Sequence, residues 1–392
     1  MHLTKEQERM LDGEEGEIVE KMFRLLVKMG DLYQADRMIP VSSCQVSGVS
    51  YKSVGEPGLE FLEDLAAKGA RVRVRTTLNP AGLDLEEWRA MGFPEDFAEK
   101  QLRILKAFER LGAEPTVTCT PYLAGLVPSR GEHLAWSESS AVVFSNSVLG
   151  ARTNREGGPS ALAAAICGLT PRYGLHLEEN RWPSLVVEVE GELEGPSDFS
   201  ALGYWVGREV GGGIPYFRGI KRAGIEELKA LGAAMAASGA VALFHVEGIT
   251  PEADPEKTKG LERMRVGREE VGKVYEELST GGEPELVVLG CPHASLEEIS
   301  RLLPLLGKNP KPFWICTSRR VKEKAMRSGL GKKVEEAGGR MVADTCAVVS
   351  PLEKLGFKTV GVDSAKAAHY LPSLCRVEVI FSPPGELLRG GR

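Results

Sequence analysis

The sequence predicts an α/β protein in which helices flank parallel sheets and the chain forms two or three domains. Two observations carry this prediction. The chain has 392 residues, 42% of them hydrophobic, so it can bury a large core and exceeds the usual size of one domain. From residue 70 onward, short β-branched runs alternate with helical stretches, which is the pattern of parallel strands joined by crossover helices.

The first part of the chain begins with helical periodicity. Apolar side chains from Ile18 to Met29 recur at helical spacing and stop at Gly30, so residues 1–37 are expected to form a helical segment that covers a sheet. The elements expected after it are, in order, a strand at 71–76, a helix at 97–111, a strand at 116–119, a loop-rich section to Pro183, an exposed strand at 185–190 and a glycine turn at 211–213.

Strands and helices are expected to alternate more clearly in the second part of the chain. A boundary is expected near residue 225, which divides the chain into 1–225, with the helical segment and a first α/β region, and 226–392, a second α/β domain. The elements expected there are strands at 240–245, 285–290, 312–317, 340–343 and 359–362, and helices at 269–278, 295–306, 321–337 and from about residue 364.

Composition argues against several classes of function. Charged residues make up 27% of the chain and the formal net charge is -6, so no overall basic field is available to hold DNA or RNA. The first residues lack an apolar signal segment, and no stretch approaches the roughly 20 apolar residues that cross a bilayer. We therefore expect a cytoplasmic protein whose main partner is neither nucleic acid nor a membrane.

The seven cysteines point to chemistry, because an odd number in a reducing compartment suggests free thiols or metal ligands. Cys119, Cys291 and Cys346 each follow an expected strand, and side chains at the carboxyl ends of strands can converge. Three thiolates could bind one four-iron cluster and leave one iron open for Lewis-acid catalysis. Cys316 also ends an expected strand, and position alone does not exclude it. A structural zinc site, with a histidine added to the three cysteines, is another alternative.

Three segments could bind the phosphate of a small substrate. Ser47-Gly48-Val49-Ser50 is a small-residue loop whose backbone amides could form a nest for an anion. Asn79-Pro80 is a turn at a strand end, and Lys366 lies at the start of a helix capped by Ser364. An ordinary loop or helix cap is the alternative interpretation of each.

Arginine and histidine side chains add further candidates. Arg152 and Arg155 are a concentration of donors suited to a carboxylate or to domain contacts, with surface salt bridges as the alternative. His293, two residues after Cys291, could donate a proton or orient a ligand, with a structural histidine as the alternative.

Longer stretches of the sequence resemble a known family. Residues 133–158, which read HLAWSESSAVVFSNSVLGARTNREGG, closely resemble the aconitase X family, and the likeness runs over nearly the whole chain. The other resembling stretches are 46–52, the surroundings of the three cysteines, 317–319 and 364–370.

The resemblance implies an aconitase-like fold and a [4Fe-4S] cluster held by Cys119, Cys291 and Cys346, with Cys316 on a neighbouring strand. This ligand set departs from that of ordinary aconitases, which use a lone cysteine and a Cys-x-x-Cys pair. With the resemblance added, the residues expected to bind the substrate are Gly48, Val49, Ser50, Asn79, Pro80, Ser139, Ser140, Arg152, Arg155, Ser318, Arg319, Ser364 and Lys366.

The resemblance further implies the large, catalytic subunit of a hydro-lyase. Members need a smaller swivelling domain, fused in some and separate in others. Because this chain stops at Arg392, that domain is expected on a separate small subunit, which would also supply the catalytic base, so no base is assigned in this chain.

The same resemblance suggests the substrate. The expected reaction is dehydration of (R)-5-phosphomevalonate to trans-anhydromevalonate 5-phosphate, in an archaeal-type mevalonate pathway of isoprenoid biosynthesis. Dehydration of cis-3-hydroxy-L-proline is the alternative. An iron-sulfur sensor or RNA-binding regulator is the alternative of another class.

Overall fold

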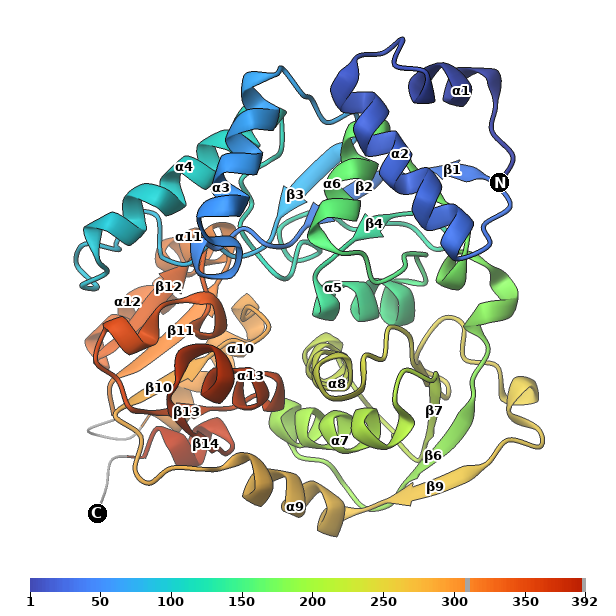
Figure 1. Cartoon of the computed structure of the whole chain (residues 1–392). Helices are drawn as coiled ribbons and strands as arrows, with labels where there is room; N and C mark the ends of the chain where they lie inside the picture. Colours follow the sequence, from blue (N-terminus) through green and yellow to red (C-terminus); the bar gives the residue numbers. More distant parts are fainter. Residues whose placement is uncertain (307–310, 390–392) are drawn as a thin grey trace.

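Three parallel sheets, each accompanied by helices, organise the chain (Figure 1). The computed structural model describes residues 1–306 and 311–389, so Arg392 lies outside the described part. The predicted α/β class is confirmed, and the chain forms three units, one around each sheet. Within the described ranges, no helix has the length and apolar character needed to cross a bilayer.

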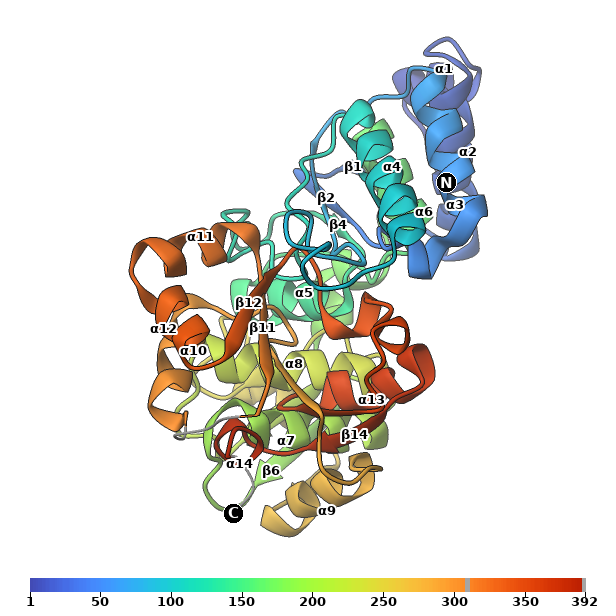
Figure 2. The same cartoon turned by 90° about the vertical axis from the view of Figure 1, so that its left-hand side faces the viewer.

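The first unit, residues 1–179, packs helices against a parallel sheet of order β3-β2-β4. Its core is apolar: Phe23, Leu26, Ile104 and Phe108 are buried together. Its strands are β1 (Met38–Pro40), β2 (Ser43–Val46), β3 (Arg75–Leu78), β4 (Ala135–Trp136) and β5 (Leu169–Pro171), and its helices are α1 (Lys5–Leu11), α2 (Glu17–Leu32), α3 (Tyr51–Ala67), α4 (Glu95–Leu111), α5 (Ser139–Phe144) and α6 (Gly158–Cys167). Figure 2 shows this unit as the upper lobe, with α5 at its lower edge.

The second unit has a parallel sheet of order β8-β7-β6-β9. Its strands are β6 (Leu185–Val189), β7 (Pro215–Arg218), β8 (His245–Val246) and β9 (Arg263–Val266), with helices α7 (Gly195–Val210) and α8 (Ile225–Gly239). Helices α7 and α8 approach so closely that a Cβ on Gly239 would lie 1.6 Å from the Gly207 carbonyl oxygen. The domain boundary predicted near residue 225 falls at the start of α8, inside this unit.

The third unit is a five-stranded parallel sheet of order β12-β11-β10-β13-β14, reached through α9 (Arg268–Leu278). The strand order reverses between β10 and β13, which is where open α/β sheets place their ligands. Its strands are β10 (Leu286–Leu289), β11 (Phe313–Thr317), β12 (Gly339–Ala343), β13 (Thr359–Val362) and β14 (Glu378–Phe381), and its helices are α10 (Leu296–Leu302), α11 (Arg319–Arg327), α12 (Leu330–Glu336), α13 (Ala365–Cys375) and α14 (Pro384–Leu387).

Several expected elements differ from the observed ones. The strand expected at 71–76 begins only at Arg75, and residues 116–119 form no strand, because Val117 has a positive φ of 43° that breaks the extended backbone. Residues 185–190 were expected to form an exposed strand, but β6 is hydrogen-bonded on both sides within its sheet.

Further differences concern one expected helix, one expected strand and the section expected to be loop-rich. The helix expected over 321–337 is two helices, because Gly329 has a left-handed φ of 80°. The expected strand at 240–245 is reduced to the two residues of β8, and the loop-rich section before Pro183 contains α5 and α6. Several further elements were not expected, among them helices α3, α7 and α8 and strands β2, β7, β9 and β14.

Candidate functional site

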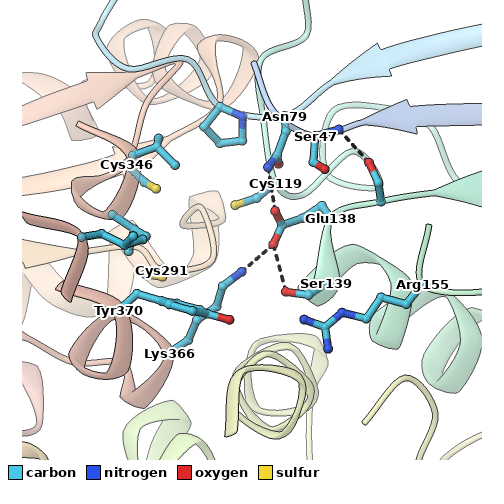
Figure 3. A pocket seen from close by; sticks show the side chains of 15 residues that line it. Ser47, Asn79, Cys119, Glu138, Ser139, Arg155, Cys291, Cys346, Lys366 and Tyr370 are labelled. Atoms are coloured by element: carbon cyan, nitrogen blue, oxygen red, sulfur yellow. Dashed lines mark hydrogen bonds and ion pairs between the residues drawn. The ribbon is translucent and has the colours of Figure 1, made fainter. Parts of the chain in front are cut away.

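A cavity of about 240 Å³ lies where the first and third units meet, at the carboxyl ends of their strands. Figure 3 shows the side chains around it. The lining residues are Ser47, Asn79, Pro80, Cys119, Ser137, Glu138, Ser139, Arg155, Cys291, Cys346, Val348, Val349, Lys366, Tyr370 and Leu374. The cavity therefore contains thiols, one buried carboxylate and two cationic side chains.

The three expected cysteines converge on this cavity. Cys291 follows β10, Cys346 follows β12, and Cys119 follows a segment that runs beside β3 through the Thr118 N–H to Leu78 carbonyl bond of 2.9 Å. Their sulfur atoms face the same space in Figure 3. Cys119 reaches the cavity because its segment runs beside β3, although that segment is not a regular strand.

The surroundings of the sulfur atoms fit metal-bound thiolates. Burial raises the pKa of all three thiols, that of Cys119 to about 12, so a nearby positive charge is needed to keep them ionised. The His293 N–H donates to Cys119 Sγ at 3.2 Å. The Ser364 hydroxyl beside Cys291 and the Val349 N–H beside Cys346 also act to lower the pKa of those thiols. A backbone N–H donor to sulfur, such as that of His293, is typical of iron-sulfur sites.

Two alternatives were left open, Cys316 as a ligand and zinc as the metal. Cys316 is 1% exposed inside β11 and does not line the cavity. In the described ranges, no three His, Cys, Asp or Glu side chains are grouped closely enough to hold a metal ion.

A buried ion pair crosses the cavity wall between Glu138 and Lys366. The carboxylate also accepts from Asn79 Nδ2 at 2.7 Å and from Ser140 Oγ at 3.0 Å. Burial acts to raise the pKa of Glu138, but the charge and hydrogen bond of Lys366, together with these two donors, lower it to about 2. For Lys366, burial acts to lower the pKa. The negative charge of Glu138 and its hydrogen bond outweigh this effect and raise the pKa above its usual range. Both side chains are therefore charged at neutral pH.

Some of the predicted substrate-binding residues meet at the cavity. Asn79, Pro80, Ser139, Arg155 and Lys366 line it. Arg155 is exposed, and within the described residues its guanidinium donates to the Ala236 carbonyl at 3.1 Å and to no carboxylate. A guanidinium at the edge of a cavity that has no carboxylate partner among the described residues is suited to an anionic group.

Other predicted residues lie close behind the cavity wall. The Ser140 side chain bonds to Glu138, and the hydroxyl of Ser364 caps α13 through the Ala367 N–H at 3.4 Å. Gly48, Val49 and Ser50 form the loop before α3, where the Ser50 hydroxyl donates to the Val349 carbonyl at 2.9 Å.

Three predicted residues lie away from the cavity in structural interactions. Arg152 pairs with Glu178 at the surface of the first unit. Ser318 caps α11, and Arg319 pairs with Asp84 and Asp344, which joins the first unit to the third. Arg319 thus fixes the segment that leads to Cys346.

Sequence reasoning missed several residues of the cavity. Glu138, Ser137 and Tyr370 line it, as do Val348, Val349 and Leu374, whereas Ser47 belongs to the small-residue loop that was predicted. Glu138 and Ser137 lie inside the 133–158 block that carried the family resemblance, which was the available signal. His293, in contrast, is fully buried and does not line the cavity, and burial lowers its pKa to about 4.

Gly290 fixes the turn that presents Cys291. Its φ is 89°, and a Cβ there would lie 2.2 Å from the Cys316 carbonyl oxygen. We expect Gly290→Ala to lower the free energy of unfolding by at least about 2 kcal/mol, because left-handed strain and a backbone clash add. Urea denaturation measures this loss.

Gly272→Ala is the matched control for this substitution, because Gly272 is inside α9 with open space around its Cα. It should gain up to about 1 kcal/mol from helix propensity. Equal stability of Gly290→Ala and the unchanged chain would contradict the role given to Gly290.

Comparison with known proteins gives consistent matches along the chain. Family models described as the aconitase X first, second and third domains match residues 1–179, 183–276 and 284–389. The phosphomevalonate dehydratase large subunit of Methanothermobacter thermautotrophicus is 54% identical over 99% of this chain and 98% of its own length. The cis-3-hydroxy-L-proline dehydratase of Pseudomonas aeruginosa is 37% identical over 95% of this chain and 67% of its own length.

A solved structure is similar over the same extent. The crystal structure of Thermococcus kodakaraensis aconitase X in its holo-form superposes with a TM-score of 0.93 at 45% identity, covering 99% of each chain. The three matched domains coincide with the three sheet-based units of the fold.

Proposed function

The chain belongs to the aconitase X family, and from this premise we propose that it is the large subunit of a hydro-lyase that dehydrates (R)-5-phosphomevalonate to trans-anhydromevalonate 5-phosphate. The observation that carries the proposal is the full-length similarity to a phosphomevalonate dehydratase large subunit, at 54% identity against 37% for a cis-3-hydroxy-L-proline dehydratase. The anion-binding groups around the cavity support it.

Cys119, Cys291 and Cys346 are proposed to hold a [4Fe-4S] cluster, since their side chains line one cavity and the His293 N–H donates to Cys119 Sγ at 3.2 Å. When bound, the cluster supplies a Lewis acid at an iron that has no protein ligand, which makes hydroxide a better leaving group. The protein supplies soft thiolate ligands for it and a largely buried wall around it.

The substrate carries two anionic groups, a carboxylate and a phosphate. Among the described residues, Lys366 and Arg155 are the two cations that line the cavity. Lys366 is engaged by Glu138, whereas Arg155 has no carboxylate partner among the described residues. We therefore assign Arg155 to the exposed anionic end of the substrate, and the hydroxyl of Ser139 with the amide of Asn79 to its inner polar groups.

Dehydration also needs a base for the proton beside the substrate carboxylate. Glu138 is the one carboxylate that lines the cavity among the described residues, and its pKa of about 2 makes it a weak base. Its role is to hold Lys366 in place. The base is accordingly proposed to come from a small subunit, the partner that the name of the Methanothermobacter relative implies for that protein.

Anaerobic co-expression with the small subunit tests the proposal. We expect the pair to dehydrate 5-phosphomevalonate at least 10-fold better, by kcat/KM, than cis-3-hydroxy-L-proline, a ratio of about 1.4 kcal/mol in transition-state binding. The large chain alone should be inactive. Activity confined to the imino acid would overturn the substrate assignment, and turnover by the large chain alone would overturn the two-subunit arrangement.

A further inference from the structure

The three cysteine-bearing segments are joined by one buried histidine. His293 is 0% exposed and lies between the segments rather than in the cavity. Its Nδ1 is 2.8 Å from Thr118 Oγ1, next to Cys119, and its Nε2 is 3.0 Å from the Thr345 carbonyl oxygen, next to Cys346. His293 itself is two residues after Cys291.

The backbone of His293 extends these connections. Its N–H donates to Cys119 Sγ at 3.2 Å, and its carbonyl accepts from Lys229 Nζ at 3.0 Å. Thr118 belongs to the first unit, Lys229 to α8 of the second and Thr345 to the third. All three units therefore bond to a single residue beside the cysteines.

The partners of the ring determine its tautomer. A carbonyl oxygen can only accept, so Nε2 carries the hydrogen and donates to Thr345. Nδ1 then accepts from the Thr118 hydroxyl, whose oxygen in turn accepts from the Thr120 N–H at 3.2 Å. The chain of bonds has one consistent direction and leaves no ring nitrogen free for proton transfer.

We propose that His293 is a positioning residue that sets the spacing of Cys119, Cys291 and Cys346 so that the three sulfur atoms can hold one cluster. The inference rests on the proposed cluster site. A cluster is rigid, so its ligands must be held at fixed separations, but the segments before Cys119 and Cys346 leave regular strand geometry at Val117 and Asp344, which have positive φ angles of 43° and 64°. The histidine bonds restrain both segments.

The other buried histidines, His176 and His245, lack this connectivity among the described residues. His245 is 2% exposed, and its Nε2 bonds to the Arg181 carbonyl at 2.9 Å, while its Nδ1 has no partner among the described residues. His245 does not line the cavity. His245→Phe therefore measures how much stability is lost when a buried histidine elsewhere in the fold is removed.

Cluster retention in the full chain tests the inference. His293→Phe removes both ring bonds, Thr118→Val removes one of them with little change of shape, and His245→Phe is the matched control. Each variant is reconstituted anaerobically with iron and sulfide, and iron content, visible iron-sulfur absorption and the rate of bleaching by a chelator are recorded. The melting temperature of each cluster-free chain is measured alongside.

We expect chelator bleaching to accelerate roughly 10 to 100-fold in His293→Phe, less in Thr118→Val, and not at all in His245→Phe, as for other groups that orient metal ligands. The melting temperatures of the cluster-free Thr118→Val and His245→Phe chains should fall by similar amounts, because each substitution removes buried hydrogen bonds, so faster bleaching in Thr118→Val but not in His245→Phe separates positioning from global stability. Bleaching of Thr118→Val and His293→Phe at the unchanged rate would overturn the inference. Absence of iron from the unchanged chain would instead overturn the proposed cluster.

Discussion

Replacing Cys291 with alanine is expected to remove the iron-sulfur absorption and to lower kcat/KM with the small subunit by roughly 1,000-fold or more. The reason is the loss of one of three proposed ligands, because a Lewis acid contributes several kcal/mol to the transition state and about 4 kcal/mol corresponds to this factor. Anaerobic reconstitution followed by iron analysis and a 5-phosphomevalonate assay measures both effects. Cys119→Ala and Cys346→Ala should behave in the same way.

Cys316→Ala provides the matched control. Cys316 is buried inside β11 of the sheet whose strand β10 precedes Cys291, and its side chain does not line the cavity. This variant should retain its iron and visible absorption, even if core packing becomes less favourable. Iron loss from Cys316→Ala, or full iron content in Cys291→Ala, would show that the ligand set is assigned wrongly.

The positions of Cys119, Cys291 and Cys346 after strands could be predicted from sequence, because the end of a strand is a local property, but Cys316 shares this property and only the family resemblance distinguished it from the other three. The fold class and most elements of the third unit were predicted for the same reason, since β10, β11 and β13 are short apolar runs bounded by turns. Residues 116–119 show the limit of this reasoning. The backbone there is not a strand, yet Cys119 reaches the cavity because the segment still runs beside β3.

The substrate-binding candidates depended on contacts that sequence does not encode locally. Arg155 and Arg319 are both arginines in polar surroundings, but Arg319 is taken up by Asp84 and Asp344, whereas Arg155 lines the cavity. Glu138 was missed because its partner, Lys366, is 228 residues away in the chain. Such pairings follow from how units pack together rather than from periodicity.

Replacing Lys366 with methionine is expected to lower the free energy of unfolding by about 3–5 kcal/mol at pH 7, the usual cost of leaving one charge of a buried pair uncompensated. Lys366 and Glu138 are 8% and 9% exposed, so solvent cannot take the place of the lost ammonium group. Activity should fall as well, because Lys366 lines the cavity. Urea denaturation of the full chain at several pH values measures the stability.

The pH dependence identifies the cause of this loss. In the unchanged protein the pKa of Glu138 is about 2, below its ordinary value of 4.5, so its ionised form stabilises the fold above about pH 4.5 and this contribution is lost as the pH falls toward 2. Without Lys366, burial raises the pKa above the ordinary value, so the variant loses stability as the pH rises through that higher value. The deficit should therefore be largest at neutral pH and shrink toward pH 4.

A double variant separates the charge effect from lost packing. Glu138→Gln together with Lys366→Met removes both charges, so it should recover part of the stability that Lys366→Met alone loses, and its deficit should not vary between pH 4 and 7. A single-variant loss below about 1 kcal/mol, in the range of exposed ion pairs, would contradict a buried, coupled pair. The same result would follow if the two side chains were separated and hydrated, and Glu138 would then be an ordinary carboxylate able to act as a base in the cavity.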